Sequence, residues 1–163
     1  MSTFRDRAAG LRRLVRSVSD RLRWLPPIVA RLAIGLVFVQ TGWGKFQNIQ
    51  KVVGFFTDLG IPAPELNARL AATAEFACGA LILIGLFTRV ATLPLIVTMT
   101  VAIYTAKRAD IHEFSDLLGM EEFLVIALLL WLGAYGPGAL SLDALLARGL
   151  DRGERVPARA AGP

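Results

Sequence analysis

Cysteine and histidine are nearly absent from this sequence. Among its 163 residues there is one cysteine, Cys78, and one histidine, His112. One cysteine excludes an intrachain disulfide and any CxxC metal or redox motif, and one histidine excludes a metal site built from several imidazoles. The sequence also has no haem ligand pair and no flavin fingerprint. We therefore expect no resident metal, no covalently bound cofactor and no autonomous redox activity.

Charged residues are also scarce, and the basic ones are concentrated toward the two ends. Charged residues make up 19% of the chain against 55% hydrophobic residues, a composition too apolar for an ordinary soluble domain. The net charge of +5 does not indicate nucleic-acid binding, because the basic residues form no patch with interleaved aromatics. We expect one domain whose core is completed by the lipid bilayer, and no nucleic-acid partner.

Four apolar segments dominate the middle of the chain, and each uncharged stretch contains roughly 13–20 residues, near the ~20 that cross a bilayer core. They lie at 27–43, 66–88, 90–106 and 123–142. The pattern predicts an all-α, polytopic membrane protein with a four-transmembrane-helix bundle over 25–147.

Basic residues are divided unequally between the two sides of this predicted bundle. Eight arginines precede or open the first segment, four follow the last, and Arg89 lies in the turn between the second and third. The other side has five basic residues against seven acidic ones. The positive-inside rule therefore predicts that both termini are cytoplasmic.

The first 24 residues form a basic cytoplasmic arm. Apolar residues recur in it at helical spacing with arginines between them, at Leu11, Leu14, Val15, Val18 and Leu22. This spacing is typical of an amphipathic helix on an anionic membrane surface. A disordered basic tail is the alternative interpretation.

The other end of the chain begins with a helix-breaking Gly136-Pro137-Gly138 sequence. Ser141 can then cap a short amphipathic helix over 142–150. From Asp151 onward the sequence is charged and rich in alanine, glycine and proline, so we assign 148–163 to a disordered cytoplasmic tail.

Glu75 is the most informative residue, because it lies in an otherwise uncharged run, 70–88. An Asp, Arg or Lys at the centre of a membrane helix costs roughly 2.5–3.5 kcal/mol, so such a residue should face other helices and have a partner. At 1.5 Å per residue, Glu75 lies roughly 13 Å from the outer end of its helix and Gln40 roughly 9 Å from the outer end of the first. Lys45 lies almost at that end and reaches inward by about 6 Å. We predict Lys45 as counter-ion, with Gln40 or a hydroxyl of the third segment (Thr98, Thr100 or Tyr104) completing the shell.

The role of each polar candidate stays open between a structural and a functional interpretation. Glu75 either fixes helix register through a buried polar contact, or acts as a proton acceptor or relay or binds a polar headgroup. Arg31, in the cytoplasmic half, is either a snorkelling interface residue or a ligand contact. Cys78 is better explained as a small packing residue than as a reactive thiolate, since a carboxylate is nearby. His112 lies among acids in an outer loop, which is either solvated or a metal contact.

Several motifs occur in a definite order along the chain. They are Arg31-x3-Gly35-x2-Phe38-x3-Gly42-x2-Lys45, a short outer loop with Phe55-Phe56 and Gly60-Ile61-Pro62, Glu75-x3-Gly79 leading into Leu83-Ile84-Gly85-Leu86-Phe87-Thr88-Arg89, and a Gly136-Pro137-Gly138 plus Ser141-Leu142-Asp143 ending. This order and spacing, over about 31–146, resembles the DoxX family of small bacterial membrane proteins.

The resemblance implies a four-helix protein of the bacterial cytoplasmic (inner) membrane, with Arg31, Lys45 and Glu75 at the family's polar positions. Some DoxX-like proteins are associated with quinone-linked sulfur oxidation, others with membrane oxidoreductase complexes, detoxification or thiol stress. Electron chemistry would then need a bound quinone or a redox partner subunit. Three hypotheses follow: an accessory or quinone-interacting subunit of a redox or detoxification system, a non-catalytic scaffold for a partner protein, and a small proton or solute carrier. A homo-oligomer is compatible with each.

Overall fold

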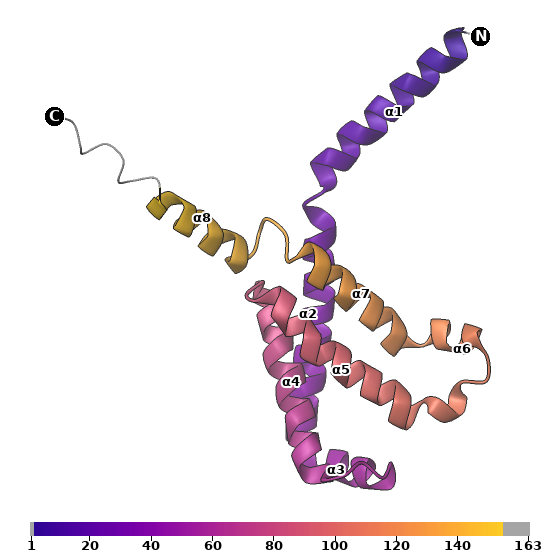
Figure 1. The fold of residues 1–163 in the computed structure, drawn as a ribbon, viewed down its shortest axis with the longest axis vertical. Coiled ribbons are helices and arrows are strands. Elements are labelled where there is room, and N and C mark those ends of the chain that lie inside the picture. The colour runs from indigo at the N-terminus through magenta and orange to yellow at the C-terminus, as the bar shows by residue number, and fades with distance from the viewer. Residues whose placement is uncertain (1, 155–163) are drawn as a thin grey trace, which may run out of the picture.

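The computed structural model describes the backbone of residues 2–154 and the side chains of residues 10, 12, 13 and 15–148. Within this part every regular element is helical. In chain order they are α1 Ser2–Leu22, α2 Leu25–Gln47, α3 Ile49–Asp58, α4 Pro64–Ile84, α5 Thr88–Ala106, the 3-10 turn η1 Arg108–Asp110, α6 Phe114–Gly119, α7 Glu121–Tyr135 and α8 Leu142–Glu154 (Figure 1). The prediction of an all-α protein is confirmed.

Three helices of the described region are long and apolar enough to cross a membrane, namely α2, α4 and α5. The fourth predicted segment contains α7, which has only 15 residues. A helix of this length spans about 22 Å, less than the roughly 30 Å of a bilayer core. The number of spans and the cytoplasmic position of the termini therefore stay predictions.

The second predicted segment is divided between two helices, which corrects its expected end at residue 88. Helix α4 ends at Ile84 because Gly85 adopts a left-handed conformation with φ 72°. The amide of Leu86 then donates to the carbonyl of Leu81 at 2.9 Å, which closes the helix end. Thr88 begins α5 instead.

The four helices of the bundle pack as two pairs, α2 with α4 and α5 with α7, and α4 also contacts α5 and α3. Glycines bring the backbones of α2 and α4 together, since a Cβ at Gly42 would lie 2.5 Å from the amide nitrogen of Phe76. A Cβ at Gly79 would lie 2.8 Å from Cβ of Phe38. Such close approach is typical of small residues at helix interfaces in membranes. The apolar core lies where the two pairs meet and includes Ile34, Phe38, Ile82, Leu95, Leu129 and Leu132.

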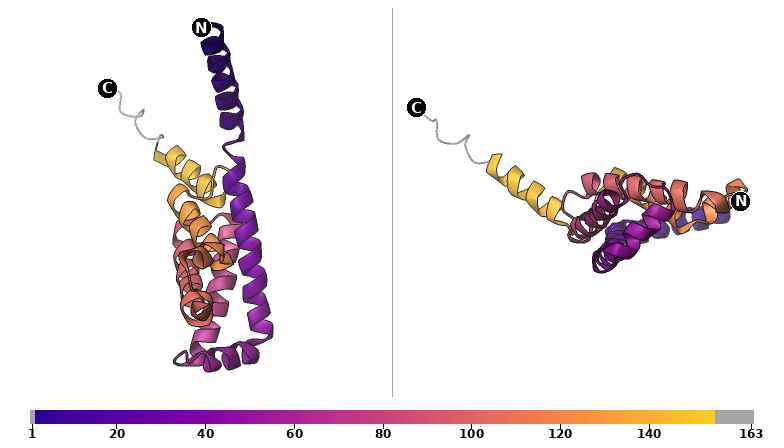
Figure 2. Two further views of the ribbon diagram at one scale, coloured as in Figure 1. Left: turned by 90° about the vertical axis from the view of Figure 1, so that its right-hand side faces the viewer. Right: turned by 90° about the horizontal axis from the view of Figure 1, so that it is seen from below.

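Helix α3 corrects the prediction of an outer loop around Phe55-Phe56. It lies across the end of the bundle opposite α1 and α8 (Figures 1 and 2). Its half-buried residues follow the spacing i, i+3, i+4, i+7 of an amphipathic helix, namely Ile49, Val52, Val53 and Phe56. This face packs toward α4.

The two ends of the chain are more helical than the disordered alternatives predict. Residues 2–22 form helix α1, in agreement with the amphipathic interpretation of the arm. Helix α8 runs to Glu154, so residues 148–154 are not disordered. Arg148, Leu150, Arg152 and Glu154 are good helix formers, which offsets the unfavourable propensity of the two glycines among them. The rest of the predicted tail, 155–163, lies outside the described residues.

The turn between α4 and α5 is joined to the start of α8, and we call Arg31, Gly85, Ser141 and Asp143 the turn cluster. The Asp143 carboxylate accepts hydrogen bonds from the amides of Phe87 at 2.8 Å and Thr88 at 3.2 Å, which caps the start of α5. The Asp143 amide donates to the carbonyl of Gly85 at 3.0 Å. Ser141 Oγ accepts from the amide of Ala144 at 3.2 Å, so the predicted cap of α8 is confirmed.

Candidate functional site

A buried ion pair joins the end of α2 to the middle of α4. Lys45 Nζ donates a hydrogen bond to Oε1 of Glu75. Glu75 is 1% exposed, whereas the Lys45 side chain keeps 29% of its surface accessible. Gly42, one turn before Lys45, allows the two helices to touch here. Oε2 of Glu75 is buried and has no hydrogen-bond partner among the described residues.

The ion pair lines an open cavity of about 1150 Å³ between α3, α4 and α5. Its walls are largely apolar and include Val52, Phe55, Phe56, Leu70, Ala71, Ala74, Val97, Met99 and Val101. The small side chains of Ala71 and Ala74 leave room beside Glu75. Glu75 is the most deeply buried polar residue of the wall.

The other polar residues of the wall are mostly satisfied by the protein itself. Thr98 Oγ donates to the carbonyl of Pro94 at 2.9 Å, and Thr105 Oγ donates to the carbonyl of Val101 at 2.8 Å. The Asn67 amide donates to the carbonyl of Pro62 at 2.6 Å. Lys45 and Glu75 therefore form the chemically distinctive part of the cavity.

The structure brings together only some of the residues predicted to surround Glu75. Gln40 is exposed on the opposite face of α2 and does not contact the pair. Among the hydroxyls of α5, Thr98 and Tyr104 line the cavity. Thr100 does not, and its hydroxyl donates to the carbonyl of Ile96 at 2.8 Å.

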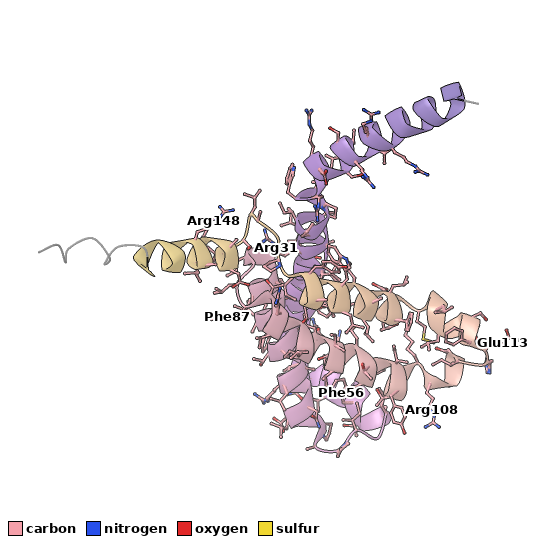
Figure 3. The ribbon with its side chains drawn as sticks, turned by 45° about the horizontal axis from the view of Figure 1, so that its top comes forward. Arg31, Phe56, Phe87, Arg108, Glu113 and Arg148 are labelled. Carbon is pink, nitrogen blue, oxygen red and sulfur yellow. The ribbon has the colours of Figure 1, made fainter. Side chains whose placement is uncertain are left out.

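Arg31 lies at the other end of α2, in the turn cluster, and does not reach Glu75. Its guanidinium donates to the carbonyl of Leu140 at 2.8 Å and to that of Pro137 at 3.3 Å. Arg31 is only 7% exposed, so the snorkelling interpretation is wrong. Figure 3 places it near the junction of α7 and α8, far from Phe56 on α3. Its hydrogen bonds to carbonyls suggest a role in holding this junction.

Comparison with protein families identifies the chain. The DoxX family model matches residues 27–108, which covers α2 to α5 and includes Arg31, Lys45 and Glu75. The chain belongs to the DoxX family. The predicted resemblance is therefore confirmed, and the matched part contains the ion pair and all three helices around the cavity.

Several DoxX relatives are membrane proteins by name. The chain is 37% identical to "Uncharacterized membrane protein Rv3486" of Mycobacterium tuberculosis over 76% of this chain and 83% of that one. It is 32% identical to "Inner membrane protein YphA" of Escherichia coli over 71% and 86%. It is 29% identical to "Putative oxidoreductase CatD" of Bacillus subtilis over 77% and 90%. No solved structure matches the chain. These relatives support a membrane protein of the DoxX family.

Cys78 and His112 lie apart from the cavity of this DoxX protein. Cys78 is half-buried and packs against the apolar core. His112 is exposed, and its amide donates to Oδ2 of Asp116 at 2.9 Å, as does the amide of Glu113. These two hydrogen bonds lower the pKa of Asp116. Within the described residues, no three His, Cys, Asp or Glu side chains form a group that could hold a metal ion.

The part of the cavity wall that α3 contributes is absent from the sequence-based site, namely Lys51, Val52, Phe55 and Phe56. The 49, 52, 53, 56 spacing of apolar residues was the available signal, since it indicates a helix with one face toward the bundle. The depths of Gln40, Lys45 and Glu75 in the membrane, from which the site was predicted, contain no information about the wall formed by α3.

Proposed function

We propose that this DoxX protein is a quinone-interacting accessory subunit of a membrane redox system, with the cavity as its ligand site. The observation that carries the proposal is the burial of one ion pair in the wall of a largely apolar cavity of about 1150 Å³. Ligand sites in proteins are typically apolar concavities with a few well-placed polar groups. The "oxidoreductase" in the name of the Bacillus subtilis relative is consistent with a redox setting.

The residues present fit a quinone on chemical grounds. A flat ring can pack against Phe55 and Phe56, and its apolar tail against the aliphatic walls of α4 and α5. An ammonium has three N–H donors, and Lys45 uses one on Glu75, so it can also orient a headgroup oxygen. A bound quinone supplies two-electron, two-proton chemistry. In this proposal Glu75 accepts or relays a proton, and a partner subunit exchanges the electrons.

We further propose that α7 is the fourth span and that both termini are cytoplasmic. The arginine-rich α1 and the start of α8 lie near the same end of the bundle (Figure 2), as the positive-inside rule requires. This orientation places Lys45 and the cavity in the outer half of the membrane. The Escherichia coli relative is named an inner membrane protein, which agrees with a cytoplasmic-membrane location.

The packing beyond Glu75 favours binding over transport. The cavity is lined on α4 by residues up to Glu75 and on α5 by residues from Pro94 onward. Toward the turn cluster, the space between the helix pairs is filled by the fully buried Ile82, Leu95 and Leu132. A site closed at one end is suited to holding a ligand that enters from the membrane.

The test is the quinone content of the purified full-length protein, measured by mass spectrometry of its organic extract. We expect quinone enriched over bulk lipid, and a several-fold loss in Glu75→Gln. Glu65→Gln is the matched control, since Glu65 is on the same helix but exposed and outside the cavity. Wild-type protein without enriched quinone, but with an intact partner complex, would instead identify a scaffold.

A further inference from the structure

We infer that the cavity favours quinones with an acidic hydroxyl on the ring, bound as the anion, and that Lys51 of α3 determines this preference. The inference rests on the proposed function, because it concerns the same cavity and narrows the class of its ligand. A neutral quinone still fits the cavity, and an anionic one gains additional affinity.

The charged residues of the cavity wall are two lysines and one glutamate, namely Lys45, Lys51 and Glu75. Two positive charges and one negative charge leave the wall with a formal net charge of +1. Lys45 and Glu75 neutralise each other in their ion pair. None of the ion pairs in the described part of the chain includes Lys51. The excess positive charge of the wall therefore belongs to Lys51.

An occupant of the cavity meets the lysines and not the carboxylate. Glu75 is 1% exposed, whereas the Lys45 side chain keeps 29% of its surface accessible. Lys51 is exposed as well as lining the cavity. Because the negative charge is both paired and covered, it opposes an anionic ligand less than the two accessible ammonium groups attract it.

Lys51 lies beside an aromatic ring at the open side of the cavity. Lys51 and Phe55 are four residues apart, so they are neighbours on one face of α3. Both line the cavity and both are exposed. Val52 and Phe56 also line the cavity but are half-buried. A quinone ring that packs against Phe55 therefore has the Lys51 side chain next to it.

An ionised hydroxyl on such a ring adds an attraction that a neutral substituent lacks. The carbonyl oxygens of a neutral quinone can accept a hydrogen bond from Lys45, and a charged oxygen makes a stronger one. The largely apolar walls screen this attraction less than water does. Ion pairs with exposed members contribute up to about fivefold in affinity. We therefore expect the anion to bind at least about threefold more tightly.

The experiment compares 2-hydroxy-1,4-naphthoquinone, which is ionised at neutral pH, with 2-methoxy-1,4-naphthoquinone, which is neutral and has the same ring. Binding to the full-length protein in a non-ionic detergent is measured by isothermal titration calorimetry, with protein-free micelles as the blank. The preference for the hydroxy compound should decrease as the salt concentration rises, because salt screens the exposed ammonium of Lys51.

Variants test whether Lys51 causes the preference. Lys51→Gln should bring the affinity ratio of the two compounds close to one, and Lys51→Glu should favour the neutral compound. Lys107→Gln is the matched control, since it removes the same charge from a lysine outside the cavity wall and should keep the wild-type ratio. Size-exclusion chromatography checks that the variants fold, which the exposure of Lys51 favours.

The possible outcomes separate this inference from the proposed function. Equal binding of the two compounds to the wild-type protein would overturn the charge preference, while the cavity would remain a quinone site. Failure of both compounds to bind would overturn the preference and count against the proposed function as well. A preference that is unchanged in folded Lys51→Gln protein would overturn the role of Lys51.

Discussion

Replacing Lys45 with methionine removes the only hydrogen-bond donor to Glu75 among the described residues and keeps most of the side-chain length. Glu75 then remains as a buried carboxylate at 1% exposure with no cation beside it. Such a group is strongly unfavourable in an apolar environment. We therefore expect Lys45→Met to destabilise the fold more than removal of both charges together.

The size of this destabilisation depends on how deeply Lys45 and Glu75 are buried from solvent. Removing one member of a fully buried ion pair costs about 3–5 kcal/mol. Because 29% of the Lys45 side chain is accessible, we expect about 3 kcal/mol, at the lower end of that range. The double variant Lys45→Met with Glu75→Gln has no charge left in the pair. It should lose only about 1 kcal/mol, the net contribution of one ordinary hydrogen bond.

The assay is a double-mutant cycle on the free energy of unfolding, measured by reversible denaturation in mixed micelles. The expected result is a coupling energy of at least about 2 kcal/mol: the loss of about 3 kcal/mol in Lys45→Met minus the loss of about 1 kcal/mol in the double variant, plus any loss in Glu75→Gln alone. The pair Glu65→Gln and Arg69→Met is the control, since its members are largely exposed and should couple weakly. Wild-type stability for Lys45→Met, or strictly additive effects, would refute a buried and energetically coupled pair.

Three further predictions concern helix contacts and caps. Gly79→Val should destabilise the fold by about 1–3 kcal/mol or more through overpacking, because even a Cβ at this position would lie 2.8 Å from Cβ of Phe38. Gly44→Ala is the control and should not destabilise the fold, since the space around Gly44 is open. Unfolding curves compare the two variants. Asp143→Ala should cost about 1–2 kcal/mol by removing the cap of α5, with faster hydrogen exchange at Phe87 and Thr88, whereas unchanged exchange would contradict this role. The pKa of Asp116 is lowered in the folded protein. Its carboxylate therefore stabilises α6 fully at pH values above the ordinary aspartate pKa of about 3.9, and this stabilisation is lost as the pH falls through the lower pKa of the folded state. An NMR titration of the Asp116 carboxyl carbon should give a midpoint below that of an unfolded peptide.

The contact of Lys45 with Glu75 could be predicted from the sequence, because a fixed rise per residue determines how deep each residue lies in the membrane. Depth alone gave the wrong neighbour in Gln40. Gln40 and Lys45 are five residues apart, which separates them by about 140° around the helix. The face toward α4 is the one that contains Phe38, Gly42 and Lys45, so the rotation of the helix excludes Gln40.

Contacts between distant parts of the chain could not be predicted in the same way. Asp143 and Phe87 are 56 residues apart. The sequence around Phe87 does not indicate that its amide will bind Asp143, and the sequence around Asp143 does not indicate which amides it will cap. Arg31 contacts carbonyls more than 100 residues later in the chain. The carbonyl of any residue can accept a hydrogen bond, so the composition of the 136–140 segment does not reveal the partner. Only the packing of α2 against α7 brings these groups together.

The cap supplied by Asp143 also sets an order on the assembly of the bundle. Helix α5 begins at Thr88, but the carboxylate that caps its first amides belongs to the residue after Leu142. During synthesis, α2 to α5 are therefore complete before this cap exists. The amide of Thr88 has no hydrogen bond to Asp143 until the ribosome has added 55 further residues. The turn cluster forms only when nearly the whole membrane domain has been made. A chain interrupted after α7 would contain the ion pair and the cavity and yet lack the contact that closes the opposite end.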